Sequence, residues 1–102
     1  MLGVRYINLA KYPRVGSDGE IRDKGALLSG FKNLTAVAKG SPADKAGLQV
    51  GDIIVMVEDE LVNGKKTLTQ MIQEYNPGED LKLTISRGNK EKVVEVKLQE
   101  LE

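Results

Sequence analysis

Residues Gly40–Asp52, GSPADKAGLQVGD, carry the signals for both the start and the end of a helix within thirteen positions. Ser41 is a favourable N-cap, because its hydroxyl can accept a hydrogen bond from a free backbone amide, and Pro42 suits the first helical position. Asp44 stands where the acidic partner of a capping box is found. Gly47 adopts left-handed backbone readily and so ends the helix. The stretch therefore predicts one very short helix with fixed ends.

A continuous apolar run follows the short helix and predicts a central strand. Residues Ile53–Val57 read IIVMV, a pattern typical of a strand that is covered on both faces. Shorter apolar or alternating stretches predict further strands at 2–7, 26–29, 35–38, 81–86 and 94–98. The last two flank a Gly-Asn turn, and we expect them to form a hairpin with one buried face.

A second, longer helix is predicted for residues 67–76. Thr67 and Gln70 form a capping box at its start, and a Pro-Gly pair ends it. Its apolar residues recur at the spacing of one helical face, namely Leu68, Met71, Ile72 and Tyr75. These elements predict an α+β fold, mainly β, in the form of a small, partly open β-barrel or sandwich. It would have five or six strands, capped by one short and one longer helix.

The composition excludes several classes of function. Fifteen Lys and Arg residues balance fifteen Asp and Glu residues, so there is no field of one sign to attract nucleic acid or an anionic membrane. No apolar stretch has the length of a membrane span. The chain has no cysteine and no histidine, which excludes disulfides, thiolate metal sites and a Ser-His-Asp triad within it. We therefore expect this chain to be no enzyme, to need no cofactor, and to have neither nucleic acid nor a membrane as a partner.

The chain has the length of one ordinary domain, and we expect residues 1–99 to form it. Pro, Gly and scattered charges predict a long, mobile loop over about residues 10–24. The first predicted strand begins almost at the first residue, which indicates a piece of a longer protein. Residues 100–102 are expected to be a tail.

Two polar features are expected to be structural. The acidic residues Glu58, Asp59 and Glu60 follow the central strand without the spacing of a calcium loop, so we expect a solvated loop there and no metal site. Ser41 has a helix to cap and is therefore no candidate nucleophile.

Residues Gly40–Ile54 closely resemble the G-S-P-A-x-x-A-G-L-x-x-G-D-x-I signature of bacterial-type PDZ domains. The resemblance extends to Asn76–Gly78 and Arg87–Lys90, and back to Leu2–Ile7, so it covers nearly the whole chain. The opening stretch is most similar to the PDZ domains that follow the protease domain in HtrA-type (Deg-type) serine proteases. The resemblance implies a peptide-binding module. In it the signature itself binds nothing, and the short helix closes one end of the barrel.

The resemblance also implies where a peptide would bind. The groove would lie between an edge strand and the longer helix, where an extended peptide adds a strand to the sheet. The family's carboxylate-binding loop falls on residues 1–4, and its glycine would let backbone amides approach a terminal carboxylate. The residues that the resemblance assigns to peptide binding are Leu2, Gly3, Val4, Arg5, Tyr6, Leu68, Met71 and Ile72. Leu2 and Val4 would line the pocket for the last side chain of the peptide.

Met1 stands where the family has an aromatic residue, so the resemblance implies an altered carboxylate loop. The expected ligands are hydrophobic C-terminal or unfolded peptides, and the expected partner is the protease domain of the parent protein. An HtrA-type parent would imply the bacterial cell envelope or periplasm. Two alternatives remain open at this point. In the first, the parent protein would be a site-two metalloprotease or a C-terminal processing protease. In the second, the chain would be an assembly domain whose groove is filled internally or by a sister chain.

Overall fold

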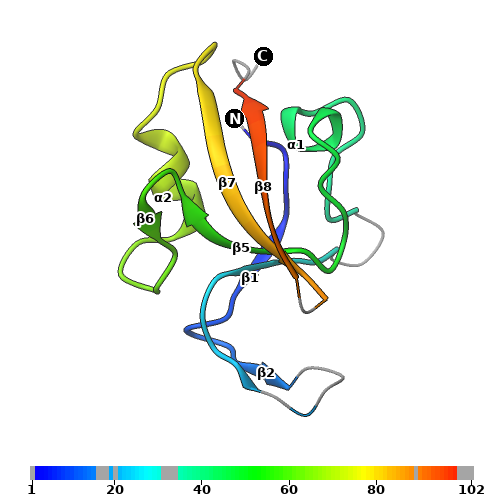
Figure 1. Ribbon diagram of the computed structural model, residues 1–102, viewed down its shortest axis with the longest axis vertical. Coiled ribbons are helices and arrows are strands. Elements are labelled where there is room, and N and C mark those ends of the chain that lie inside the picture. Colours follow the sequence, from blue (N-terminus) through cyan, green and yellow to red (C-terminus); the bar gives the residue numbers. More distant parts are fainter. Residues whose placement is uncertain (1, 16–18, 20, 31–34, 89, 99–102) are drawn as a thin grey trace.

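The computed structural model describes residues 2–15, 19, 21–30, 35–88 and 90–98 of the chain. Its main feature is an antiparallel sheet with the strand order β1-β4-β5-β7-β8 (Figure 1). These strands are β1 (Tyr6–Asn8), β4 (Ala26–Leu28), β5 (Ile53–Val57), β7 (Asp80–Arg87) and β8 (Lys90–Lys97), and the short β6 (Glu60–Leu61) pairs with β5. The sheet does not close, so β1 and β8 are its edges. The predicted fold class, α+β and mainly β, is confirmed.

The first helix, α1 (Pro42–Lys45), has the predicted bounds because local groups cap it. The hydroxyl oxygen of Ser41 accepts a hydrogen bond of 3.2 Å from the Asp44 amide. Gly47 has a φ of +87°, left-handed backbone that suits glycine and stops the helix. Figure 1 shows α1 and the second helix on opposite sides of the long β7–β8 hairpin.

The second helix, α2 (Leu68–Gln73), is shorter than predicted. Its start is as expected, since Thr67 and Gln70 make both hydrogen bonds of the capping box. At its end the Glu74 and Tyr75 amides donate to carbonyl groups three residues earlier, at 3.3 and 3.1 Å. This tighter turn does not continue the α-helical ladder, so the helix ends before the predicted last residue.

The hydrophobic core lies between the inner face of the sheet and the two helices. Leu81, Leu83 and Ile85 alternate with more exposed residues along β7, as the sequence pattern predicts, and all three are buried. Ile54 of β5 and Leu28 of β4 are buried beside them. Burial of each such side chain contributes about 1.5–3 kcal/mol to the stability of the fold.

The N-terminal strand begins later than predicted. Gly3 has a φ of +85°, far from the extended values of a regular strand, and Val4 makes only an isolated bridge to Val37. Regular pairing starts at Tyr6, the first residue of β1. The strand predicted around Val37 is likewise reduced to that one bridge among its described residues.

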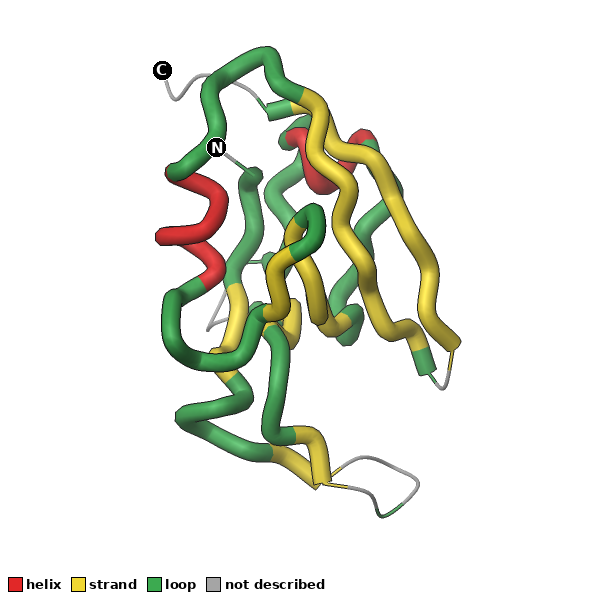
Figure 2. The backbone as a smooth tube through the Cα atoms, turned by 60° about the vertical axis from the view of Figure 1, so that its left-hand side comes forward, coloured by secondary structure: helices red, strands yellow, loops and turns green. Residues whose placement is uncertain are grey.

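The predicted loop at residues 10–24 contains a small two-stranded ladder. β2 (Arg14–Val15) pairs with β3 (Ile21–Arg22), and both apolar residues of this ladder are exposed. Figure 2 shows the ladder extending beyond the end of the main sheet. Residues 16–18 and 20 of the predicted loop, and the predicted tail at 100–102, lie outside the described residues. The mobility of this segment stays a prediction.

The acidic cluster, predicted to be a solvated loop, lies at the turn of a hairpin, and Asp59 and Glu60 are exposed there. Glu58 and Asp59 form the turn between β5 and β6, and Glu60 pairs with Val57. Glu58 has a φ of +52°. Among the described residues, no group of three acidic side chains is placed to hold a metal ion. In the same part of the chain, no helix combines the length and the apolar character needed to cross a membrane.

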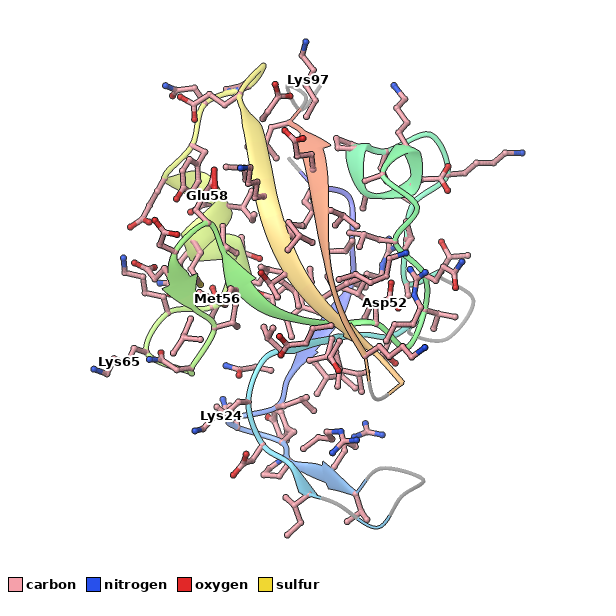
Figure 3. All side chains as sticks on the ribbon, viewed as in Figure 1. Lys24, Asp52, Met56, Glu58, Lys65 and Lys97 are labelled. Atoms are coloured by element: carbon pink, nitrogen blue, oxygen red, sulfur yellow. The ribbon has the colours of Figure 1, made fainter. Side chains whose placement is uncertain are left out.

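A bidentate ion pair joins the end of the α1 turn to the sheet. The guanidinium group of Arg87 donates to both carboxylate oxygens of Asp52, at 2.9 and 2.8 Å, and to the Gly47 carbonyl at 3.1 Å. Asp52 lies just before β5, on the side of the molecule that carries α1 (Figure 3), and is only 1% exposed. Burial alone would raise the pKa of Asp52, but hydrogen bonds from Arg87 and the Gln49 amide hold it below its ordinary 3.8.

We expect Arg87→Ala to lower the melting temperature at pH 7 by on the order of 10 °C, because it leaves the buried Asp52 carboxylate without its cation. Arg14→Ala, at an exposed position of β2, is the matched control and should leave the melting temperature nearly unchanged. Because the folded-state pKa of Asp52 is depressed, the pair stabilises the fold above the unfolded-state value and loses this effect as the pH falls through the folded-state value. Thermal melts from pH 7 to 2 should therefore show the gap between wild type and Arg87→Ala closing below about pH 4.

Candidate functional site

A cavity of about 630 Å³ lies between the N-terminal segment and α2. Of the eight residues predicted to bind a peptide, seven line it, namely residues 2–6, Leu68 and Ile72. The first group lies at the start of the chain and the second in α2, more than sixty positions later. The fold brings the two groups together as the two walls of one groove. Leu2 and Ile72 are themselves almost fully buried and pack on the core behind the groove.

Met71 is the exception among the predicted residues. It does not line the cavity, is only 1% exposed and belongs to the core. Leu68 and Ile72 are four positions apart and so share one helical face, whereas Met71 is turned about 100° away from Ile72, toward the sheet. The prediction that Met71 faces the groove was wrong for this reason.

Other described residues that line the groove were not on the predicted set. Thr69 and Gln73 lie on α2, four positions apart, one residue after Leu68 and Ile72. The sequence could have indicated these two residues, because residues four positions apart lie on the same side of a helix, and this pair is adjacent to the pair Leu68 and Ile72. Tyr75 was recognised only as part of the apolar helix face. Burial raises the pKa of its hydroxyl and four nearby glutamates raise it further, so Tyr75 is neutral at physiological pH.

The backbone of residues 2–4 is held from the side of α1. The Ala43 amide, in the first turn of α1, donates to the Leu2 carbonyl at 3.1 Å, and the Ala38 amide donates to the Gly3 carbonyl at 2.9 Å. The Ser41 hydroxyl lies 3.5 Å from the same Gly3 oxygen. Three backbone and side-chain donors therefore fix the direction of two carbonyl groups.

The direction of these carbonyls sets the direction of the next amides. In a planar trans peptide group, the carbonyl and the amide point in opposite directions. The amides of Gly3 and Val4 therefore point away from α1. Of the residues that donate to these two carbonyls, Ala38 lines the cavity, but no described residue of α1 does. The amides that point away from α1 are therefore placed to face the cavity. Two converging amides beside a glycine with φ of +85° form a concave donor site that suits an anion.

β1 offers a free edge next to these amides. In the pairing of Val4 with Val37 and of Tyr6 with Leu28, the hydrogen bonds are made by the flanking residue Arg5. Its amide donates to Ala36 at 2.8 Å and its carbonyl accepts from Ser29 at 3.0 Å. The backbone groups of Val4 and Tyr6 themselves therefore face the open edge, where another extended chain can pair with them.

Arg5 adds a positive charge at the rim of the groove. Its side chain donates to the Thr35 carbonyl at 2.9 Å, which holds it beside the groove. The predicted contact of Arg5 with a ligand stays a prediction. Met1, the first residue of the predicted carboxylate loop, lies outside the described residues.

A sequence profile of the PDZ domain matches residues 1–98 of the chain. The chain belongs to the PDZ domain family. The position of the groove agrees with that assignment, since PDZ domains bind extended peptides at a sheet edge. The Gly40–Asp52 signature contributes to the groove of this PDZ domain indirectly, because the first turn of α1 orients the amides of residues 3 and 4. No local sequence pattern indicates this contribution.

The PDZ domain is similar to segments of bacterial serine proteases. It is 39% identical over 75 residues to a DegP-like periplasmic serine endoprotease of Bartonella henselae, covering 74% of this chain and 14% of that protein. It is 34% identical over 85 residues to a CtpA-like serine protease of Staphylococcus haemolyticus, covering 81% of this chain and 16% of that protein. The chain thus spans less than a fifth of the length of these relatives.

A solved PDZ domain has the same fold. The structure of the HtrA3 PDZ domain bound to a phage-derived ligand, FGRWV, superposes with a TM-score of 0.66 at 23% identity. The comparison covers 95% of this chain and 82% of that one.

We expect Ser41→Ala to shift the amide resonances of Gly3 and Val4 in a two-dimensional NMR spectrum, because it loosens the α1 turn that holds the residue 2 and 3 carbonyls. Thr67→Ala is the matched control, since it removes the N-cap of α2, whereas the carbonyls of residues 2 and 3 accept their hydrogen bonds from Ala43, Ala38 and Ser41. Both variants should lose about 1 kcal/mol of stability. Equal, small shifts at Gly3 and Val4 in both variants would show that α1 does not orient these amides.

Proposed function

We propose that this PDZ domain binds the carboxyl end of extended peptides with an apolar last residue, which add a strand to β1. The observation that carries the proposal is the orientation of the Gly3 and Val4 amides into the cavity. A terminal carboxylate placed there accepts charge-assisted hydrogen bonds, which are stronger than those between neutral groups. The bound peptide then continues antiparallel to β1 and uses the outward backbone groups of Val4 and Tyr6.

The lining of the cavity supports an apolar last side chain. The lining residues include the apolar side chains of Leu2, Val4, Leu68 and Ile72 and the ring of Tyr75. No Lys, Asp or Glu is among the described residues that line it, and the cation Arg5 is held at the rim by Thr35. A basic side chain in the cavity would therefore lose its hydration without gaining an ion pair. The FGRWV ligand of the similar HtrA3 domain also ends in an apolar residue. Leu2, Gly3, Val4, Arg5, Tyr6, Leu68 and Ile72 are the proposed binding residues.

We also propose that the domain serves a serine protease of the bacterial cell envelope, where it recognises substrates or regulates the protease domain. The similarity to DegP-like and CtpA-like proteases supports a protease parent of either kind. The chain itself is proposed to be the binding module and to hydrolyse nothing. The purified chain should leave casein intact over a long incubation, and cleavage that resists serine-protease inhibitors would overturn this part of the proposal.

A peptide ending in valine with a free carboxylate should bind more tightly than the same peptide with a C-terminal amide, by about tenfold to a hundredfold. This is the factor for about 1.5–3 kcal/mol, the contribution of a hydrogen bond to a charged group. Fluorescence anisotropy of a labelled peptide measures both affinities. Equal binding of the two peptides would rule out carboxylate capture.

Val4→Pro should lower the affinity for the peptide with a free carboxylate by a similar factor, because proline lacks the amide that points into the cavity. Val93→Pro is the matched control. Val93 lies on the other edge strand, β8, and is 65% exposed, and its position opposite Thr84 turns its amide outward. This control should bind as the wild type does. Unchanged binding by Val4→Pro would place the ligand elsewhere on the domain.

A further inference from the structure

The hydroxyl of Tyr6 joins the two walls of the groove. It accepts a hydrogen bond of 3.0 Å from the Thr69 amide and lies 3.0 Å from the Thr69 hydroxyl. Tyr6 belongs to β1 and Thr69 to the first turn of α2, so this contact spans the gap between the strand and the helix. The ring of Tyr6 thus crosses the groove at one fixed place.

The capping of α2 fixes this contact. The first amides of a helix have no partner within it. The Thr67 hydroxyl accepts a hydrogen bond of 3.1 Å from the Gln70 amide. The Tyr6 hydroxyl accepts a hydrogen bond from the amide of Thr69, the residue just before Gln70. The Tyr6 ring also packs against the hydrophobic core. Moving Tyr6 aside would uncap an amide and expose apolar surface, so the ring is held in position.

The cavity ends where Tyr6 crosses the groove. On the strand side its described lining residues run from Leu2 to Tyr6 and include no later residue of β1. On the helix side they begin with Leu68 and Thr69 and continue toward Tyr75. The open volume therefore lies between the amides of residues 3 and 4 and the ring of Tyr6, and the Tyr6–Thr69 contact is its end wall.

The register of an added strand places one peptide residue against this wall. If the last residue of the peptide pairs with Val4, the third residue from the end pairs with Tyr6, because both strands advance by two residues between successive outward-facing positions. Directly paired residues in an antiparallel ladder put their side chains on the same face. The third side chain from the end therefore lies directly beside Tyr6, whose ring reaches across to Thr69 and occupies the space in front of it.

We propose that Tyr6, held by Thr69, restricts the third residue from the carboxyl end of the ligand to a small side chain. The inference rests on the proposed function and adds a specificity-determining residue to it. The last side chain enters the open cavity and can be large, whereas the third meets a closed wall. Both hydroxyl groups of the wall are already engaged with each other, so the wall also offers no ready partner to a polar side chain.

Two peptides test the inference. They are identical hexapeptides ending in valine with a free carboxylate, with alanine or leucine at the third position from the end. The wild-type domain should bind the alanine peptide at least about tenfold more tightly, a factor that corresponds to about 1.4 kcal/mol. Tyr6→Ala should bring this preference close to one, because it opens the wall. Tyr12→Ala replaces a tyrosine that is 58% exposed and outside the groove, and it should keep the wild-type preference.

Each outcome bears on the inference. If the wild type binds both peptides equally, the inference is wrong while the proposed function stands. If the wild type binds neither, the proposed function is wrong and the inference falls with it. If Tyr6→Ala does not fold, Tyr6→Phe decides, since it keeps the ring and removes the hydrogen bonds to Thr69. A several-fold smaller preference in Tyr6→Phe supports the inference, and an unchanged preference overturns it. The ratio of the affinities for the two peptides reports specificity, because a general loss of domain stability would lower both affinities by the same factor.

Discussion

Two backbone carbonyl groups, those of Leu2 and Gly3, determine what the groove of this PDZ domain presents. Donors on α1 and at Ala38 hold them on one side, and peptide planarity turns the following amides to the other. This explains why a helix of one turn is sufficient. Its useful part is its start, where unpaired amides are available. Ser41 uses one of them to fix the turn, and the Leu2 carbonyl uses another to fix the groove.

The two edges of the sheet differ in what they expose. β8 reads KEKVVEVK, so charged side chains surround its free edge. Lysine on an edge strand disfavours pairing with another chain, because the charge would have to be buried. β1 reads YIN and lies beside an apolar cavity. The fold therefore leaves one edge suitable for an added strand and protects the other. The Asp52–Arg87 pair contributes to this arrangement, because it fixes the α1 turn to β7 and so fixes the support of residues 2–4.

Features encoded locally could be predicted from the sequence, and features that depend on distant contacts could not. The N-caps at Ser41 and Thr67 were predicted correctly, because an N-cap hydrogen bond joins residues three positions apart. The full capping box was correct for Thr67 and Gln70 only, since the Asp44 carboxylate accepts a hydrogen bond from the Gly40 amide instead. The direction of Met71 was not, because all residues of an apolar helix face look alike until the neighbouring sheet is placed. The Tyr6–Thr69 contact joins residues 63 positions apart and has no local signal. The late start of β1 follows from Gly3, whose backbone was expected to be compatible with a strand.

The β2–β3 ladder lies apart from the groove strand β1, although both belong to the N-terminal third of the chain. Tyr6, Ile7 and Asn8 are paired residue by residue with β4, so the register of the groove strand is complete before the ladder begins. The ladder extends beyond the sheet, and none of its described residues lines the cavity. The chain length between β1 and β4 is thus free to vary without moving the groove. This segment is accordingly the natural place to insert a fluorescent reporter or an affinity handle into the domain.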